Sequence, residues 1–126
     1  MTAKKPTVDD FLADLDHPRV EEIRRIRSAL IVGDSELGER IKWNAPSFGH
    51  DGNDRVTFRL QPGDRFEVFL HRGVQKRVDP FNFDDPERLI TWATNDRGIL
   101  VVPSPLTAAD EIRLITLMRR WLQATR

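Results

Sequence analysis

Hydrophobic residues recur with a helical period at both ends of the chain. Thr7 followed by Asp10 is a capping pair for a short first helix with the apolar face Val8, Phe11, Leu12 and Leu15. Pro18 suits the first turn of a second helix, which Gly33 ends, with the apolar stripe Val20, Ile23, Ile26, Leu30 and Ile31. Thr107 caps a long last helix with the inward residues Ile112, Leu114, Ile115, Leu117, Met118, Trp121 and Leu122.

Between the helices the period changes to two, which is typical of strands. Val56, Phe58 and Leu60 share one face, and Phe66, Val68 and Leu70 repeat the pattern after a turn at 61–65. A slip of one residue would mix apolar and polar faces, so the pattern predicts the pairing. The expected pairs are Phe58 with Val68, Arg59 with Glu67, Thr57 with Phe69, and Arg55 with His71.

Three segments are less regular. The stretch 35–40 is expected to make one further helical turn, and 99–102 a short buried strand. Asp85-Pro86-Glu87 reads as a helix start, whereas the β preference of Ile90-Thr91-Trp92 favours a strand over 86–94. The fold class predicted is α+β: two N-terminal helices and a long C-terminal helix pack on one face of an antiparallel sheet of about five strands. The other face of that sheet is left exposed.

Composition narrows the classes of function. A chain of 126 residues without an apparent linker is expected to be a single domain, 1–126. It has no cysteine, which excludes disulfides, thiolate zinc sites and cysteine nucleophiles. Lys plus Arg and Asp plus Glu both number 20, and this balance argues against a nucleic-acid partner. No apolar run approaches membrane-spanning length, so we expect a soluble cytoplasmic protein without a membrane partner.

The segment from Ile41 to Phe48 is the most distinctive stretch. It holds Trp43, Asn44, Pro46 and Phe48 where a helical region is expected to give way to an extended one. Because proline biases the preceding residue toward an extended conformation, helix should end before Ala45. Large aromatic side chains at such a corner indicate either a packing hinge or the wall of a pocket.

These residues also carry a family resemblance. Val8-Asp9-Asp10-Phe11-Leu12, the Trp43-Asn44-Ala45-Pro46-Ser47-Phe48 segment and the amphipathic C-terminal helix resemble the YdhG-like family, small bacterial proteins of unassigned function. His71-Arg72-Gly73, Trp92 and Asp96-Arg97 resemble one branch of it. The resemblance implies a fold similar in outline to frataxin. Through one relative described as a frataxin-like intracellular iron chaperone, it also raises iron carriage as a hypothesis.

Two candidate sites follow. Asp9, Asp10 and Asp14 offer hard oxygen ligands on the first helix, and Asp10 and Asp14 lie one turn apart, where they could share ferrous iron. Capping and solubility explain the same carboxylates. The second candidate is a pocket on the exposed sheet face for an anionic small molecule, and its residues are Trp43, Asn44, Pro46, Phe48, Arg59, Phe69, His71 and Arg72. An ordinary solvated face with a cross-strand Arg59–Glu67 pair is the alternative.

Catalysis has little support in the sequence. No serine lies in a nucleophile elbow, the three histidines are scattered, and no glycine-rich phosphate loop is present. We therefore expect a binding protein, either an iron carrier or a receptor for a small anionic ligand, more than an enzyme. The alternative is a module that self-associates through the exposed sheet face, so both a monomer and a homodimer stay open.

Overall fold

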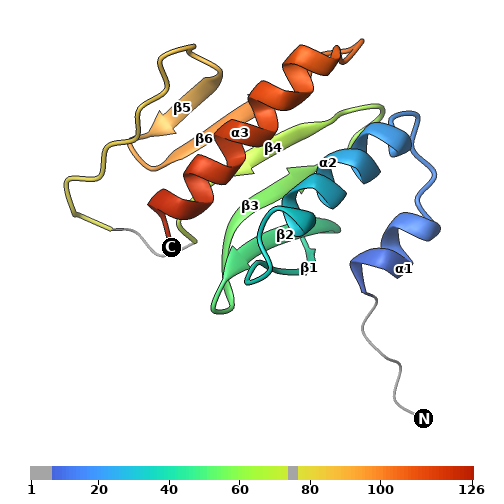
Figure 1. Ribbon diagram of the computed structural model, residues 1–126, viewed down its shortest axis with the longest axis horizontal. Coiled ribbons are helices and arrows are strands. Elements are labelled where there is room, and N and C mark those ends of the chain that lie inside the picture. The colour runs from blue at the N-terminus through green and yellow to red at the C-terminus, as the bar shows by residue number, and fades with distance from the viewer. Residues whose placement is uncertain (1–6, 74–76) are drawn as a thin grey trace.

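The computed structural model describes residues 7–73 and 77–126. Their order is α1 (Val8–Ala13), α2 (Val20–Val32), β1 (Gly38–Lys42), β2 (Ala45–His50), β3 (Asn53–Arg59), β4 (Glu67–Leu70), β5 (Ile90–Thr94), β6 (Arg97–Val101) and α3 (Ala108–Ala124) (Figure 1). The fold is α+β as predicted. The antiparallel sheet has six strands in the order β1-β2-β3-β4-β6-β5, one more than expected.

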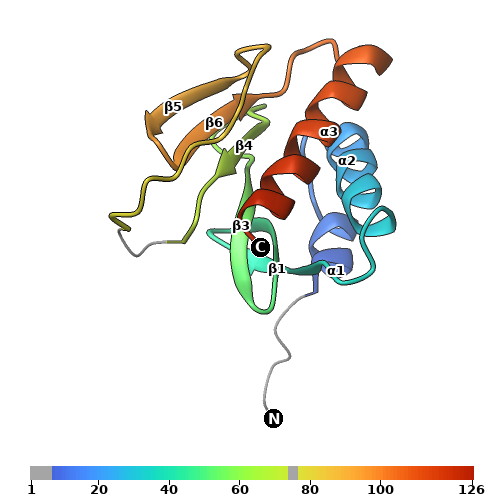
Figure 2. The same cartoon turned by 60° about the vertical axis from the view of Figure 1, so that its left-hand side comes forward.

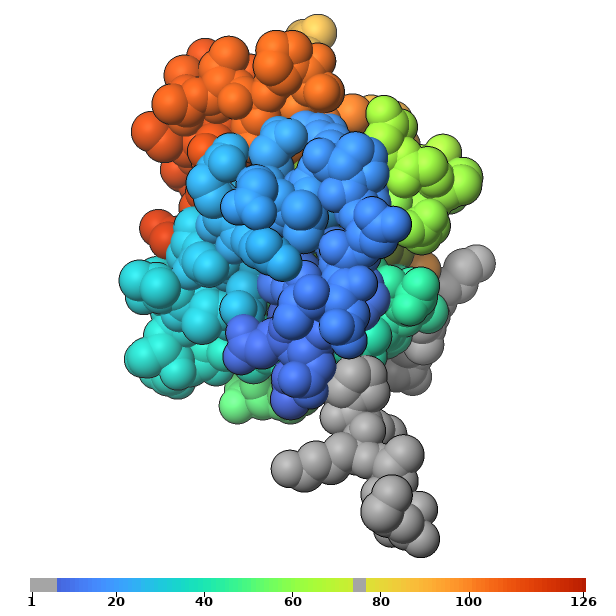
Figure 3. Space-filling model, turned by 90° about the vertical axis from the view of Figure 1, so that its right-hand side faces the viewer, coloured from blue at the N-terminus to red at the C-terminus, as the bar shows by residue number. Residues whose placement is uncertain are grey.

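All three helices lie on one side of the sheet, and the other side stays open (Figure 2). Seen from the side of the N-terminal helices, α1 and α2 lie against each other in a continuous surface (Figure 3). The core between the layers contains Phe48, Phe58 and Phe66, whose neighbouring ring centroids lie 5.1 and 5.3 Å apart. We call the uncovered side the open face.

The predicted helix ends are largely confirmed. Thr7 and Asp10 form a reciprocal capping box at α1, the Thr107 hydroxyl accepts from the Asp110 amide at α3, and Gly33 is the C-cap of α2. The inward face of α3 differs at one position. Ile112 is 66% exposed, because the helix turns Leu114, Leu117, Met118, Trp121 and Leu122 toward the core instead.

The β3–β4 register is confirmed residue by residue. Thr57 faces Phe69, Phe58 faces Val68 and Arg59 faces Glu67. Beyond the end of β4, the His71 amide donates to the Arg55 carbonyl, which continues the same register.

The segment 35–40, expected to make a further helical turn, is a turn followed by the start of a strand. Residues 38–42 form edge strand β1, because pairing with β2 supplies backbone hydrogen bonds that outweigh the helix preference of Glu39 and Arg40. Over 86–94, where helix and strand were both open, the strand alternative is correct for Ile90–Thr94. The Asp85 carboxylate accepts from the Leu89 and Ile90 amides at 3.0 and 2.8 Å, which stops a helix before it forms, and Ile90 begins β5.

Candidate functional site

Trp43 and Asn44 form the two-residue turn between β1 and β2. Lys42 pairs with Ala45, and the two turn residues have φ of 53° and 59°. A tight hairpin turn of this kind needs positive φ at both central positions, which suits asparagine and glycine. For tryptophan the left-handed conformation costs about 1–2 kcal/mol. Pro46, two residues after Asn44, already lies in β2, so the chain passes from one strand to the next at this turn. Of the two turn residues, Trp43 is the less suited to the left-handed conformation.

The turn places the Trp43 ring over the open face. Its centroid lies 6.1 Å from that of Phe69 and 5.8 Å from that of His71. The Lys42 ammonium lies 4.8 Å from the tryptophan ring centroid, within cation–π range. Despite these contacts Trp43 is 56% exposed. The ring thus overhangs the sheet without being covered.

One row of paired residues crosses all six strands on the face over which this ring lies. In sheet order its members are Arg40, Ser47, Thr57, Phe69, Ile99 and Thr91. Side chains alternate between the faces of a sheet, so all six belong to the open face, with neighbouring strands about 4.8 Å apart. The centre of this row, from Thr57 to Ile99, is the floor of a cavity.

That cavity has a volume of about 490 Å³ and is lined by Trp43, Asn44, Thr57, Phe58, Arg59, Leu60, Gln61, Phe69 and Ile99. Among the residues that the structure describes, Arg59 is the only charged member of the lining. Its closest carboxylate contact is a long one, 3.8 Å to Glu67, and half of its side chain is exposed. The cavity has the size of a small-molecule site, apolar walls and a cation at the rim.

A buried chain of polar groups includes Thr57 of the floor. The Gly73 amide donates to Nδ1 of His71 at 3.0 Å, so the ring proton is on Nε2, which lies 2.9 Å from the Thr57 hydroxyl oxygen. The Thr57 and Ser47 hydroxyl oxygens are 2.7 Å apart. Burial lowers the pKa of His71 to about 4, and the nearby Lys42 charge adds to this effect, so the ring is neutral.

Asp54 ends this chain. Burial alone would raise the pKa of its carboxyl group, but hydrogen bonds from Arg40, Lys42 and Ser47 outweigh burial and hold that pKa below its usual value. The Ser47 hydroxyl lies 3.4 Å from the Val56 carbonyl oxygen, which only accepts. The order in which every proton has an acceptor therefore runs from His71 to Thr57, from Thr57 to Ser47 and from Ser47 to Val56. His71 therefore donates to Thr57 and cannot remove its proton as a general base would.

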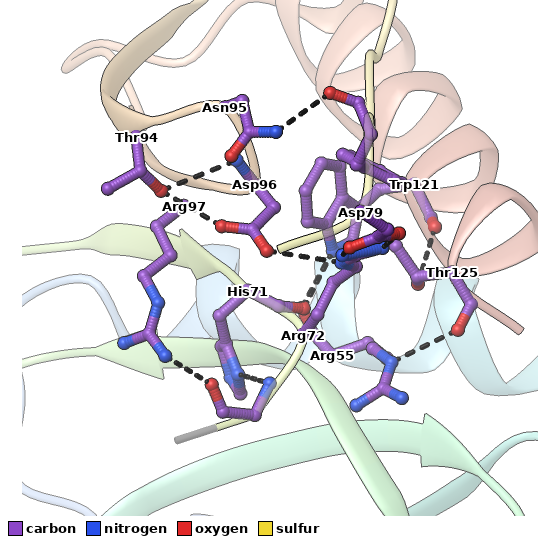
Figure 4. A network of polar contacts seen from close by, with 12 residues as sticks. Arg55, His71, Arg72, Asp79, Thr94, Asn95, Asp96, Arg97, Trp121 and Thr125 are labelled. Carbon is purple, nitrogen blue, oxygen red and sulfur yellow. Dashed lines mark hydrogen bonds and ion pairs between the residues drawn. The ribbon is translucent and has the colours of Figure 1, made fainter. Parts of the chain in front are cut away.

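A second network borders the site (Figure 4). Arg72 pairs with Asp79 and with Asp96, and its guanidinium lies 4.2 Å from the Phe81 ring centroid. These contacts join the end of β4 to the 79–81 segment and to the β5–β6 turn. Trp121 of α3 donates through its ring N–H to the Arg55 and His71 carbonyls at 2.9 and 3.2 Å. This network is structural, since each charged group in it already has a partner.

The structure brings together half of the predicted pocket residues. Trp43, Asn44, Arg59 and Phe69 line the cavity, and His71 lies directly behind it, fully buried against the Trp43 and Phe69 rings. The other three lie elsewhere. Phe48 packs in the core on the helix side, Pro46 is buried in β2 opposite Ile41, and Arg72 belongs to the bordering ion-pair network.

Sequence reasoning missed several contributors, among them three that matter most for the chemistry of the site. Ile99 enters the floor because β6 pairs with β4, and Ser47 and Asp54 enter the polar chain through β2–β3 pairing. The alternation within β3 and β4 is visible in the sequence, whereas these partners depend on sheet order. The only available signal was the apolar residue Ile99 within a short buried strand.

Two of the three carboxylates of the acidic candidate have partners within the protein. The Asp10 carboxylate caps α1 by accepting from the Thr7 amide, Asp9 pairs with Arg27 at 2.8 Å, and Asp14 is the C-cap of α1. Within residues 7–73 and 77–126, no group of three or more His, Asp or Glu side chains is arranged to hold a metal ion.

Comparisons with family models, curated proteins and solved structures found no match for this chain. Membership of the YdhG-like family thus stays a prediction from the residues quoted above. In the part of the chain that the structure describes, no helix is long and apolar enough to cross a membrane.

Proposed function

We propose that this protein is a receptor for a small anionic ligand with a flat apolar body, bound in the open-face cavity under Trp43. The observation that carries the proposal is the conformation of Trp43. Its backbone bears left-handed strain and its ring remains more than half exposed, although asparagine or glycine would form the same turn without strain. Strain of this kind persists where it serves a site.

The cavity supplies the complementary features. Trp43 and Phe69 offer ring faces to a flat group, and Ile99 extends the apolar floor. Arg59 supplies a positive charge at the rim, where a carboxylate or phosphate would find a planar donor with no short competing ion pair. Cytoplasmic residence remains part of the proposal.

The test is a ligand-observed NMR screen of aromatic and aliphatic carboxylates and phosphates against three proteins. Trp43→Asn removes the ring and suits the turn, so it keeps the fold. Val101→Thr, a near-isosteric change at an open-face residue outside the cavity, is the matched control. We expect aromatic anions to bind the parent and Val101→Thr, and to lose about tenfold or more in affinity with Trp43→Asn, the scale of a lost aromatic contact. Anions that bind Trp43→Asn with the same affinity as the parent protein would contradict the proposal.

Self-association through the open face is the second candidate. It is favoured by the exposure of Trp43 and of Val101, which is 60% exposed on the same face. Sedimentation at increasing protein concentration separates the two functions. A stable dimer that Trp43→Asn and Val101→Thr both weaken, together with an empty ligand screen, would favour self-association over the receptor.

A further inference from the structure

We infer that the ligand of this cavity carries a hydroxyl or N–H group that donates a hydrogen bond to the Thr57 hydroxyl oxygen, at the opposite end from its anionic group. The inference rests on the proposed receptor function and adds the polarity that its ligand must have.

The donor and acceptor order of the buried hydrogen bonds decides whether the Thr57 hydroxyl can donate to a ligand or accept from it. The Gly73 amide fixes Nδ1 of His71 as an acceptor, so Nε2 is the donor to Thr57. The Val56 carbonyl oxygen, 3.4 Å from the Ser47 hydroxyl oxygen, is an acceptor only, so Ser47 is the donor in that contact. The Thr57 hydroxyl proton therefore points to Ser47, 2.7 Å away and out of the cavity.

One lone pair of the Thr57 hydroxyl oxygen remains for a ligand. A hydroxyl oxygen has one proton and two lone pairs. The proton is committed to Ser47 and one lone pair to His71, which leaves a single lone pair for a cavity that Thr57 lines. Thr57 is itself buried. A ligand acceptor placed against its oxygen would give up hydrogen bonds to water and gain none in return, which is unfavourable.

The distance between Thr57 and Arg59 along β3 determines how far apart the donor and the anionic group of the ligand must lie. Thr57 and Arg59 lie two residues apart on the same side of the strand, about 6.6 Å between their Cα atoms. The Arg59 side chain extends this span farther toward the rim. A flat ring with a donor at one end and a carboxylate at the other matches this order. The para-hydroxycinnamate ion has that form.

The experiment compares three probes that differ at one end only: para-hydroxycinnamate, para-methoxycinnamate and cinnamate. Affinities are measured by NMR titration with the parent protein, Thr57→Val and Thr57→Ser. We expect para-hydroxycinnamate to bind the parent about tenfold more tightly than the other two probes, as a buried hydrogen bond allows. Thr57→Val should reduce that ratio to about one, and Thr57→Ser should preserve it.

The outcomes separate this inference from the proposed function. If all three probes bind equally and Trp43→Asn abolishes their binding, the donor inference is overturned and the receptor stands. If no cinnamate binds but other anions from the screen do, the inference is again overturned alone. If nothing in the screen binds, both fail. Should Thr57→Val not fold, the three-probe comparison in the parent and in Thr57→Ser still decides.

Discussion

His71 shows how burial fixes the chemistry of one side chain. Its ring is enclosed by Phe69 and Trp43 and is hydrogen-bonded at both nitrogens, so it has a defined tautomer as well as no charge. The sequence analysis placed His71 among the ligand contacts of the pocket. The structure makes it the donor that orients Thr57.

The lowered pKa of His71 predicts a pH dependence of stability. Between pH 6.5 and about 4 the unfolded chain binds a proton at this residue and the native protein does not. The free energy of unfolding therefore falls as pH falls through that window, with His71 contributing at most about 3 kcal/mol.

Urea unfolding at pH 7, 6, 5 and 4.5 would measure this contribution. His71→Gln keeps an N–H donor for Thr57 and does not titrate, so its pH dependence should be shallower than that of the parent. His17 and His50 are present in both proteins and cancel in the comparison. Identical slopes would show that His71 is not buried as a neutral group.

The strands depend on backbone positions that the residue pattern only partly reveals. At Gly49 the β2–β3 register shifts, and a Cβ there would lie 1.6 Å from the Asn53 carbonyl oxygen. Its cross-strand partner Gly38 is less restricted, since a Cβ there would lie 3.3 Å from the Gly49 oxygen. The bulge matters for the site because it lies between Ser47 and Asp54, which share the polar chain.

Gly49→Ala should therefore destabilise the protein by about 3 kcal/mol or more, because backbone must move to admit the methyl group. Gly38→Ala, on the neighbouring strand, should cost less than about 1 kcal/mol. Chemical denaturation of both variants gives the two values. Equal losses would mean that the bulge accommodates a side chain.

The packing between distant segments rests partly on Arg72. Its ion pairs with Asp79 and Asp96 and its contact with Phe81 hold the 79–81 segment and the β5–β6 turn against the end of β4 (Figure 4). Arg72 and Asp96 are both largely buried, so the interaction is shielded from water. The strand β6, which supplies Ile99 to the cavity, is thus held at its first residues.

Arg72→Met should lower the free energy of unfolding by about 2 kcal/mol, since it leaves Asp96 without its charged donor. Hydrogen exchange should accelerate in β5 and β6 more than in α2. The matched control is Arg113→Met, which removes an exposed arginine that pairs with Asp110 at 3.1 Å and should cost less than about 1 kcal/mol. Uniform acceleration across both layers would argue against a local role for Arg72.

Local patterns were sufficient for the fold class, the helix caps and the β3–β4 register, because periodicity and capping act between residues close in sequence. They placed Thr57 opposite Phe69 and both on the exposed face, which is the centre of the cavity floor. They were wrong at 35–40, and they left helix and strand both open over 86–94. In both places pairing with a neighbouring strand decided the outcome.

The rest of the site was decided by tertiary structure. Whether Trp43 is a core residue or a pocket wall depends on a left-handed turn that swings its ring back across the sheet to Phe69. Whether Thr57 donates or accepts depends on His71, Ser47 and the Val56 carbonyl, which strand pairing brings together. A sequence pattern records which face a side chain takes, whereas its hydrogen-bond partners across a sheet follow from the order of the strands.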